Sequence, residues 1–325
     1  MFSKGKTLVS LIVLATIVLT ACSAPTPAAT AVPTKAPATA APTVTPTKPA
    51  ATVAPTVAPT VKPTLPQPTA DIKPGTCLGT AEKAIVDLKC KEIKIAMENA
   101  YPPFNYITIS TGKPGGWDYD VWNEICVRLH CTPKYIEAAW EGMIQAVADN
   151  QFDAAADGIT ITDDRKKIVD FSTGYVKIDQ RLLVRKGEAR FKSIDDFKTN
   201  EKLVLGTQTG TTNYETAAEI LPEKRIKAFE QFPFAVQALI SGDIDAVIMD
   251  ETAGQGYLGE NSDKVALLGP SIVSQELGFI FPKGSTLVDP VNQAIKAMMA
   301  DGTLQKFNVK YFGPNFKAIE ADIQK

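Results

Sequence analysis

Short apolar segments alternate with segments of helical periodicity from Lys91 onward. The apolar run at 93–97 predicts a buried strand, and the spacing of apolar residues predicts helices near 118–129 and near 141–149. Further strands are expected at 134–136, 152–156, 181–185, 203–205, 246–249 and 278–281, and further helices after Thr162, Thr212, Phe232 and Asp289. This alternation predicts an α/β fold with mostly parallel strands.

An internal repeat indicates that this α/β region contains two related units. The sequence QAV followed by FDA at 145–154 matches QAL followed by IDA at 237–246, at a constant offset of 92 residues. Each copy is expected to form a helix, a tight turn and a strand. The copies end at Asp157-Gly158 and at Met249-Asp250. Ligands of open α/β sheets bind beyond the carboxyl ends of the strands, so both dipeptides are expected to face a pocket between two lobes.

Residues 23–75 differ in composition from the rest of the chain. They include 13 Pro, 12 Thr and 13 Ala and contain no aromatic residue. Such a segment cannot bury a core and behaves as a semi-rigid spacer. About 250 residues are left for the folded part, which is enough for one large or two smaller units.

The N-terminus has the pattern of a secretory signal. Lys4 and Lys6 precede an apolar run at 8–19 that is too short to span a bilayer. The run ends in Leu-Thr-Ala before Cys22, which resembles the bacterial lipobox, where the peptide is cut before a cysteine that receives a diacylglyceryl group. We therefore predict a lipoprotein signal peptide at 1–21 and a lipidated Cys22 at the start of a linker, 22–75. The alternative is an ordinary export signal with an incidental cysteine.

Two acyl chains suffice for stable membrane attachment. We therefore expect an extracytoplasmic protein that is anchored to the cell membrane by Cys22. Export also places the other cysteines in an oxidising compartment, and they form two pairs that are close in sequence. The expected disulfides are Cys77–Cys90 and Cys126–Cys131.

Charge and histidine content exclude several classes of function. The chain has 34 basic and 36 acidic side chains, a formal net charge of −2, which argues against a nucleic-acid binder. His130 is the single histidine, so there is little material for a His/Cys metal site or a Cys–His nucleophile. The sequence contains no Ser–His–Asp order, no Gly-rich phosphate loop and no metal-ligand spacing. We expect no cofactor and no metal.

Arg165 is a candidate for binding an anionic group. Thr162 can cap the helix that follows it, which leaves Arg165 in the first turn, where a cation opposes the helix dipole. A guanidinium that grips a carboxylate through two parallel bonds would explain this position. The alternative is a surface arginine that pairs with Asp163 or Asp164.

Other residues suit the remaining groups of a small polar ligand. Thr212 and Glu215 have capping-box spacing at a helix start whose N–H groups suit an anion, although most such boxes only cap. Asp250 ends an apolar strand and suits an ammonium group, or else caps the helix that follows.

Three aromatic residues, Tyr101, Phe104 and Trp140, lie near predicted strand ends, where aromatic rings can wall a ligand. Aromatic residues are more often part of the core, and Phe104 is expected there. Asp153 and Asp245 come just before strands and are interpreted as turn residues, not as a catalytic pair.

Taken together, the motifs resemble those of the bacterial solute-binding proteins of family 3, the polar amino acid receptors of ABC importers. In order along 91–313 they are YPPF at 101–104, GWDYD at 116–120, GITIT at 158–162 with Arg165, DFS at 170–172, QTGTT at 208–212, DAV at 245–247 with Asp250, and DGTL at 301–304.

The resemblance implies a two-lobed, periplasmic-binding-protein-like fold of type II with a ligand cleft between the lobes. Two hinge crossovers are then expected near 175–183 and near 272–279. Within a solute-binding domain at 76–325, lobe 1 would comprise about 91–178 and 276–325, and lobe 2 about 182–273.

The resemblance also implies roles for single residues. Arg165 would hold the ligand α-carboxylate with help from Thr160 and Thr212, and Asp250 would meet the α-ammonium together with a carbonyl of Gly158 or Asp157. Tyr101 and Trp140 would stack on the ligand. The full ligand-binding set predicted in this way is Glu98, Tyr101, Trp140, Asp157, Gly158, Thr160, Arg165, Gln208, Thr211, Thr212, Met249 and Asp250.

Two departures from the family pattern bear on the ligand. Glu98 stands where the family usually has Asp, and Asp157 stands where Ser or Ala is usual. Two carboxylates in the pocket favour a cationic side chain, arginine or lysine ahead of glutamine, which Tyr101 and Trp140 would sandwich. The alternative is that Glu98 bonds to the backbone and Asp157 turns away, which leaves a pocket for neutral polar ligands.

The sequence thus predicts a receptor, not an enzyme, that captures a free amino acid by hinge closure and delivers it to an ABC transporter permease. Its other expected contact is with the membrane through the lipid anchor, and a monomer that binds no nucleic acid is expected. One alternative is an enzyme on the same scaffold, such as a cyclohexadienyl dehydratase, which the complete set of amino acid clamp residues disfavours. Another is an amino acid sensing domain that acts on a signalling partner.

Overall fold

The computed structural model describes residues 73–108 and 112–313, which all belong to one unit, 59–325. The predicted signal peptide, Cys22 and residues 23–72 of the linker lie outside the described residues. None of the described helices has both the length and the apolar character that spanning a bilayer requires.

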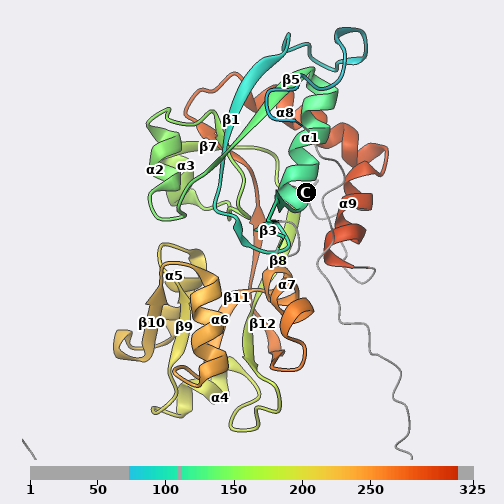
Figure 1. The fold of residues 1–325 in the computed structure, drawn as a ribbon. Coiled ribbons are helices and arrows are strands. Elements are labelled where there is room, and N and C mark those ends of the chain that lie inside the picture. Colours follow the sequence, from blue (N-terminus) through green and yellow to red (C-terminus); the bar gives the residue numbers. More distant parts are fainter. Residues whose placement is uncertain (1–72, 109–111, 314–325) are drawn as a thin grey trace, which may run out of the picture. The chain divides into compact units, whose positions relative to one another are not determined.

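Lobe 1 is built on a five-stranded sheet with helices on both faces (Figure 1). The strand order is β5-β1-β6-β13-β7, in which β1 is parallel to β5 and β6, and β13 is antiparallel to β6 and β7. The strands are β1 (Lys91–Met97), β5 (Cys131–Glu137), β6 (Ala154–Ala155), β7 (Val169–Phe171) and β13 (Ile280–Pro282). The helices are α1 (Trp117–Leu129), α2 (Met143–Ala148), α3 (Asp163–Ile168), α8 (Val288–Ala300) and α9 (Thr303–Phe312). A short 3-10 helix, Ala81–Lys83, precedes β1, and a small sheet is formed by β2 (Ala100–Tyr101), β3 (Asn105–Ile107) and β4 (Pro114–Gly115).

Lobe 2 contains a second five-stranded sheet, in the order β10-β9-β11-β8-β12. Strand β9 is parallel to β10 and to β11, whereas β8 is antiparallel to β11 and β12. The strands are β8 (Val176–Arg185), β9 (Leu205–Gln208), β10 (Ile226–Phe229), β11 (Ala246–Asp250) and β12 (Val265–Leu277). The helices are α4 (Ile194–Thr199), α5 (Thr212–Ile220), α6 (Phe232–Ser241) and α7 (Glu251–Asn261), with a 3-10 helix at Glu223–Arg225.

Two chain crossovers connect the lobes, through β8 and β12. At the lobe 1 end, the Tyr175 N–H donates to the Leu277 carbonyl (3.0 Å) and the Gly278 N–H donates to the Ile159 carbonyl (2.9 Å). Both strands then continue into the lobe 2 sheet as a long antiparallel pair (Figure 1). The two-lobed α/β prediction is confirmed, while the expectation of mostly parallel strands is wrong for β8, β12 and β13, because the chain crosses between the lobes twice and returns in the opposite direction.

The two copies of the internal repeat make equivalent hydrogen bonds in the two lobes. In lobe 1, a carboxylate oxygen of Asp153 accepts a hydrogen bond from the Lys94 N–H (2.8 Å). In lobe 2, Asp245 accepts the equivalent bond from the Val204 N–H (2.8 Å). Both aspartates therefore tie a helix–strand turn to the neighbouring strand, in agreement with their interpretation as turn residues.

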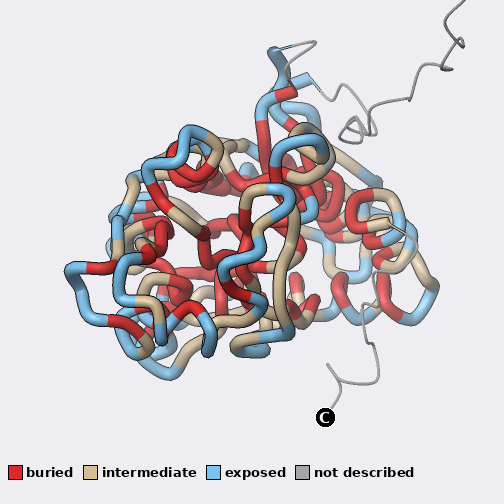
Figure 2. The backbone as a smooth tube through the Cα atoms, turned by 90° about the horizontal axis from the view of Figure 1, so that it is seen from below, coloured by how far each residue is buried: buried red, intermediate tan, exposed pale blue. Residues whose placement is uncertain are grey.

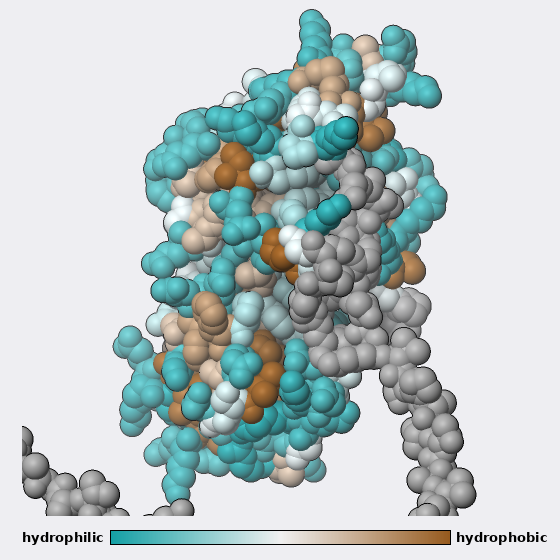
Figure 3. All heavy atoms as spheres, in the orientation of Figure 1, coloured by the Kyte–Doolittle hydropathy of each residue, from teal (hydrophilic) through white to brown (hydrophobic). Residues whose placement is uncertain are grey.

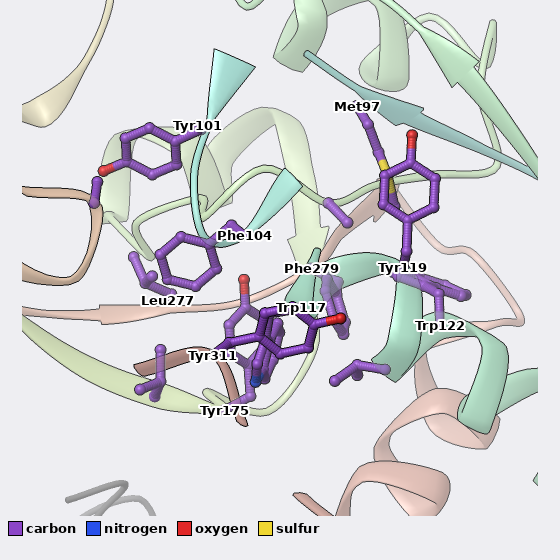
Figure 4. Close-up of a cluster of buried hydrophobic side chains, with 14 of the residues drawn as sticks. Met97, Tyr101, Phe104, Trp117, Tyr119, Trp122, Tyr175, Leu277, Phe279 and Tyr311 are labelled. Carbon is purple, nitrogen blue, oxygen red and sulfur yellow. The ribbon is translucent and has the colours of Figure 1, made fainter. Parts of the chain in front are cut away.

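Aromatic rings fill the core where lobe 1 meets the crossovers. Trp117 and Tyr175 have ring centroids 4.7 Å apart, and Tyr175 and Phe279 have centroids 4.5 Å apart (Figure 4). Phe104 is fully buried, as predicted. Figure 2 shows buried residues in the interior and exposed residues at the peripheral turns. On the face drawn in Figure 3, most of the coloured surface is hydrophilic.

The structure contains both expected disulfides. Cys126–Cys131 joins the last turn of α1 to the first residue of β5, and Cys77–Cys90 holds the arm that precedes β1. The imidazole Nε2 of His130 lies 3.2 Å from the Cys90 sulfur. Because that sulfur is bonded to Cys77, this His/Cys cluster is a disulfide and not a set of metal ligands.

Candidate functional site

A pocket lies where the lobes meet, with about 310 Å³ of empty space that includes space open to solvent. Its walls come from the carboxyl ends of β1 and β6 in lobe 1 and of β9 and β11 in lobe 2, as expected for open α/β sheets. The lining residues are Glu98, Tyr101, Trp140, Asp157, Gly158, Thr160, Arg165, Gln208, Thr211, Thr212, Asn213, Phe232 and Asp250.

The pocket brings together all of the residues predicted for ligand binding except Met249. Met249 is fully buried in the core next to Asp250, because alternate residues of a strand point to opposite faces. The sequence interpretation missed Asn213 and Phe232. Both lie at helix starts, in α5 and α6, and both helices begin just beyond the carboxyl end of a strand. Ligands of α/β sheets bind at such positions, so the sequence could have indicated both residues.

Arg165 is held in the pocket by the start of α3. The Thr162 hydroxyl caps this helix by accepting from the Arg165 N–H (3.2 Å), as predicted. The guanidinium is buried, donates to the carbonyls of Thr160 (2.9 Å) and Gly210 (3.5 Å), and lies 5.4 Å from the centre of the Trp140 ring. Burial lowers the pKa of Arg165. None of the described carboxylates lies within ion-pair distance of this cation.

The surface alternative for Arg165 is wrong. Asp163 and Asp164 are exposed and pair with Lys166 and Lys167 on the outer face of α3. The guanidinium instead points inward, where none of the described carboxylates forms an ion pair with it, although the charges of Glu215 and Asp250 favour its ionised form. Such a buried charge is unfavourable unless a ligand supplies the counter-ion.

The start of α5 differs by one residue from the prediction. Thr211 is the N-cap, since its hydroxyl accepts from the Tyr214 N–H (3.1 Å), and Thr212 is the first residue of the helix. The predicted capping box between Thr212 and Glu215 is therefore wrong. The shift leaves the Thr212 side chain free of a capping role.

The Thr212 hydroxyl bridges the lobes at the back of the pocket. It donates to the Gln275 side-chain carbonyl on β12 (2.9 Å) and lies 3.2 Å from the Thr160 hydroxyl of lobe 1. The Gln180 amide on β8 donates to Thr212 (3.3 Å) and to Gln275 (3.0 Å). The two crossover strands thus contact the threonines that line the pocket.

Asp250 provides the negative charge on the lobe 2 side. It is buried, and its carboxylate accepts from the Tyr101 hydroxyl (2.6 Å) and from the Asn213 amide (3.2 Å). Burial raises the pKa of Asp250 to about 6, against the opposing effect of these two hydrogen bonds. Its side chain makes no capping bond to α7, so the capping alternative is wrong.

The aromatic residues line the pocket in different ways. The Tyr101 ring is stacked between Phe104 and Phe232, with centroid distances of 5.6 Å and 5.4 Å. Gly158 has a positive φ of 58°, and a Cβ at this position would lie 2.8 Å from the Tyr101 ring, so this close approach requires glycine. Trp140 is covered by the Arg165 guanidinium.

Glu98 and Asp157 form an acidic corner of the pocket. Glu98 accepts from the Gln208 amide across the cleft (2.8 Å), and Asp157 accepts from the Asn105 amide (2.7 Å). Burial raises the pKa of Glu98 to about 8 and that of Asp157 to about 7, and the Asp157 charge contributes to the rise at Glu98. Asp157 does not turn away from the pocket, which it lines.

Residues 93–314 match the family of bacterial extracellular solute-binding proteins, family 3. The chain belongs to this family. The L-cystine-binding protein TcyJ of Escherichia coli K12 is 31% identical over 221 residues, which cover 67% of this chain and 82% of that protein. The L-arginine-binding protein of Pseudomonas aeruginosa is 30% identical over 231 residues, which cover 68% and 88%.

Solved structures of other solute-binding proteins have the same fold. The arginine-, lysine-, histidine-binding protein ArtJ of Geobacillus stearothermophilus has a TM-score of 0.66 and 28% identity, over 72% of this chain and all of that one. An ancestral arginine-binding protein bound to arginine has a TM-score of 0.64 and 31% identity, over 68% of this chain and 98% of that one. The two-lobed architecture is therefore that of family 3.

Proposed function

We propose that this family 3 protein is the receptor of an ABC importer, which binds a free polar amino acid with a cationic side chain between its lobes and delivers it to the permease. One observation carries the proposal. A buried guanidinium from lobe 1, Arg165, and a buried carboxylate from lobe 2, Asp250, line the same pocket. Relatives with about 30% identity are named for binding cystine, arginine and histidine.

The two charges suit the two ends of an α-amino acid. Arg165 offers N–H donors to the α-carboxylate, beside the N-terminus of α5, where Thr211 and Thr212 line the pocket. Asp250 has lone pairs left beside those used by Tyr101 and Asn213, so it accepts from the α-ammonium without losing either partner. Because the clamp is divided between the lobes, the ligand is gripped fully when they close.

The acidic corner favours a cationic side chain. Glu98 and Asp157 each disfavour ionisation of the other, and an ammonium or guanidinium between them relieves that repulsion. An anionic side chain meets unfavourable charge in the same place. The Trp140 ring is used by Arg165, and the Tyr101 ring already stacks on Phe104 and Phe232, so the guanidinium sandwich between Tyr101 and Trp140 is not part of the proposal.

The proposal includes the targeting of the chain. A lipoprotein signal peptide, 1–21, precedes Cys22, which anchors the protein through lipid on the outer side of the cell membrane. The linker, 22–75, then presents the binding domain, 76–325, to the permease as a monomer. At about 3.1 Å per residue, residues 23–75 reach at most roughly 160 Å from the membrane.

Thermal unfolding of the purified chain with each of the twenty amino acids tests the proposal. Arginine and lysine are expected to give the largest increase in melting temperature, with glutamine behind them, because a ligand stabilises the state that it binds. Competition calorimetry then ranks the affinities. If glutamate or aspartate binds more tightly than arginine and lysine, the cationic assignment is wrong.

A product assay tests whether the protein acts as an enzyme. One structural neighbour, with a TM-score of 0.63 and 31% identity, is the ancestral amino acid-binding protein AncCDT-1, a precursor of cyclohexadienyl dehydratase. The purified chain is expected to leave prephenate unchanged on incubation. Product formation would place the chain among enzymes of this scaffold.

A further inference from the structure

Helix α7 of lobe 2 touches lobe 1 outside the ligand pocket. The Tyr257 hydroxyl donates to the Ala100 carbonyl (2.7 Å), and Tyr257 is only 7% exposed. One residue earlier, a Cβ on Gly256 would lie 2.6 Å from the Pro102 carbonyl oxygen and 2.7 Å from its carbon. α7 also contacts α9 of lobe 1, and it lies at the level where the lobes meet (Figure 1).

Glycine is unfavourable inside a helix, so its presence in α7 needs a reason. At Gly256 the reason is the backbone of residues 102 and 103, which lies too close for any side chain and cannot move aside as a side chain can. Gly254, two residues earlier and therefore on the opposite side of α7, differs. A Cβ there would meet the end of the flexible Leu267 side chain, which belongs to the same lobe.

The contact also aligns the pocket. Ala100 and Pro102 flank Tyr101, whose hydroxyl bonds to Asp250, and Asp250 immediately precedes α7. Docking of α7 on residues 100–103 therefore brings the Tyr101 hydroxyl and the Asp250 carboxylate to 2.6 Å. Neither Gly256 nor Tyr257 lines the pocket itself.

We propose that Gly256 and Tyr257 are positioning residues, which hold the lobes closed through the contact of α7 with residues 100–103 and so set ligand affinity without touching the ligand. This rests on the proposed function. The affinity of a ligand for the closed state is reduced by the fraction of protein that is not closed, so a contact that favours closure raises the apparent affinity.

Gly256→Ala, with Gly254→Ala as the matched control, tests the contact. Both changes improve the helix propensity of α7, but only Gly256→Ala inserts a methyl group between the lobes. L-arginine affinity, measured by calorimetry on the full chain, is expected to fall at least tenfold in Gly256→Ala and less than twofold in Gly254→Ala. Tyr257→Phe keeps the ring and removes one hydrogen bond, and a loss of severalfold is expected.

Amide hydrogen exchange gives a readout that needs no ligand. Without ligand, the peptide covering 98–108 is expected to exchange faster in Gly256→Ala than in the wild type or Gly254→Ala. Saturating L-arginine is expected to protect it in all three proteins, with at least tenfold more ligand needed in Gly256→Ala. Equal affinity and equal exchange in the two alanine variants would overturn the proposal. If the wild type binds no amino acid, the proposed function fails, and the ligand-free exchange rates still decide for or against the contact.

Discussion

The guanidinium of Arg165 is buried against Trp140 and two backbone carbonyls, with no ion-pair partner among the described carboxylates. Arg165→Ala is expected to weaken amino acid binding by roughly 2–5 kcal/mol, because it strands the ligand carboxylate in a buried site. The melting temperature of the ligand-free protein should not fall, since the variant removes an unpaired buried charge. Calorimetry and thermal unfolding measure the two effects.

Lys166→Ala is the matched control for Arg165. This neighbour lies in the same helical turn but is exposed and pairs with Asp163 at the surface. Its removal should leave affinity unchanged. Near-native affinity in Arg165→Ala would remove that residue from the clamp.

Glu98 and Asp157 make the affinity for arginine depend on pH. Burial raises their pKa values to about 8 and about 7, so at pH 6 the pocket holds protons that a cationic ligand must displace. Arginine affinity should therefore rise between pH 6 and pH 8, with proton release that calorimetry in buffers of different ionisation enthalpy detects. Neutral glutamine should show a smaller change, and Glu98→Gln should reduce the slope for arginine. A flat profile for arginine in the wild type would contradict this.

The same carboxyl groups give the ligand-free protein an opposite pH dependence. Their pKa values in the folded state lie above the ordinary values of 4.5 and 3.8, so folding favours the protonated forms. The free energy of unfolding should therefore decrease as pH rises from about 5 to 8. Thermal unfolding of the wild type and of a Glu98→Gln, Asp157→Asn double variant checks this, since the variant should lose much of the slope. A wild-type melting temperature that rises through this range would be inconsistent with the buried acids.

At the scale of elements, the sequence predicted the N-cap of a helix correctly where only one residue could serve as that cap. Thr162 caps α3 as predicted because a single hydroxyl lies in the right place. In α5 two adjacent threonines both fit, and only tertiary packing decides that Thr211 caps and that Thr212 contacts Gln275. The long strand β12 was not predicted from the sequence pattern, and only the crossover expected near 272–279 overlaps it. Pro270 and a register shift between Leu268 and Val273 break its pattern.

The two disulfides stabilise different elements. Cys126 and Cys131 are fully buried and join α1 to β5 inside the core of lobe 1, so replacing both by alanine is expected to lower the free energy of unfolding by about 2–3 kcal/mol. Cys77–Cys90 closes a longer loop, which by chain entropy alone stabilises more. It holds only an arm at the surface, however, so its removal leaves the core of lobe 1 packed and should cost less. Chemical denaturation of the two double variants measures the difference. Free thiols at these positions in the denatured, unreduced protein would show that the bonds are absent.

At the scale of the whole molecule, the sequence indicated the pocket but not its closure. Motifs placed Glu98, Arg165 and Asp250 at strand ends or helix starts, and strand ends meet in α/β folds. The bonds that join the lobes, such as Gln208 to Glu98 and Tyr257 to Ala100, connect residues more than one hundred positions apart. No periodicity or local motif encodes such pairs, because they depend on how two separately folded sheets are oriented by β8 and β12.

In the proposed function, the lipid on Cys22 attaches the whole molecule to the membrane. Cys22→Ala removes the acceptor of the lipid, and without two acyl chains the exported protein has no stable attachment. The variant is expected to move from the membrane fraction to the soluble extracytoplasmic fraction. Ser23→Ala, the neighbouring change, should leave the protein in the membrane fraction. Arginine affinity should stay the same in both variants, because residues 23–75 separate Cys22 from the binding domain. If Cys22→Ala remains in washed membranes with segment 1–21 removed, or if mass spectrometry of the wild type shows no acyl groups on Cys22, the lipid anchor is wrong, while the binding function is unaffected.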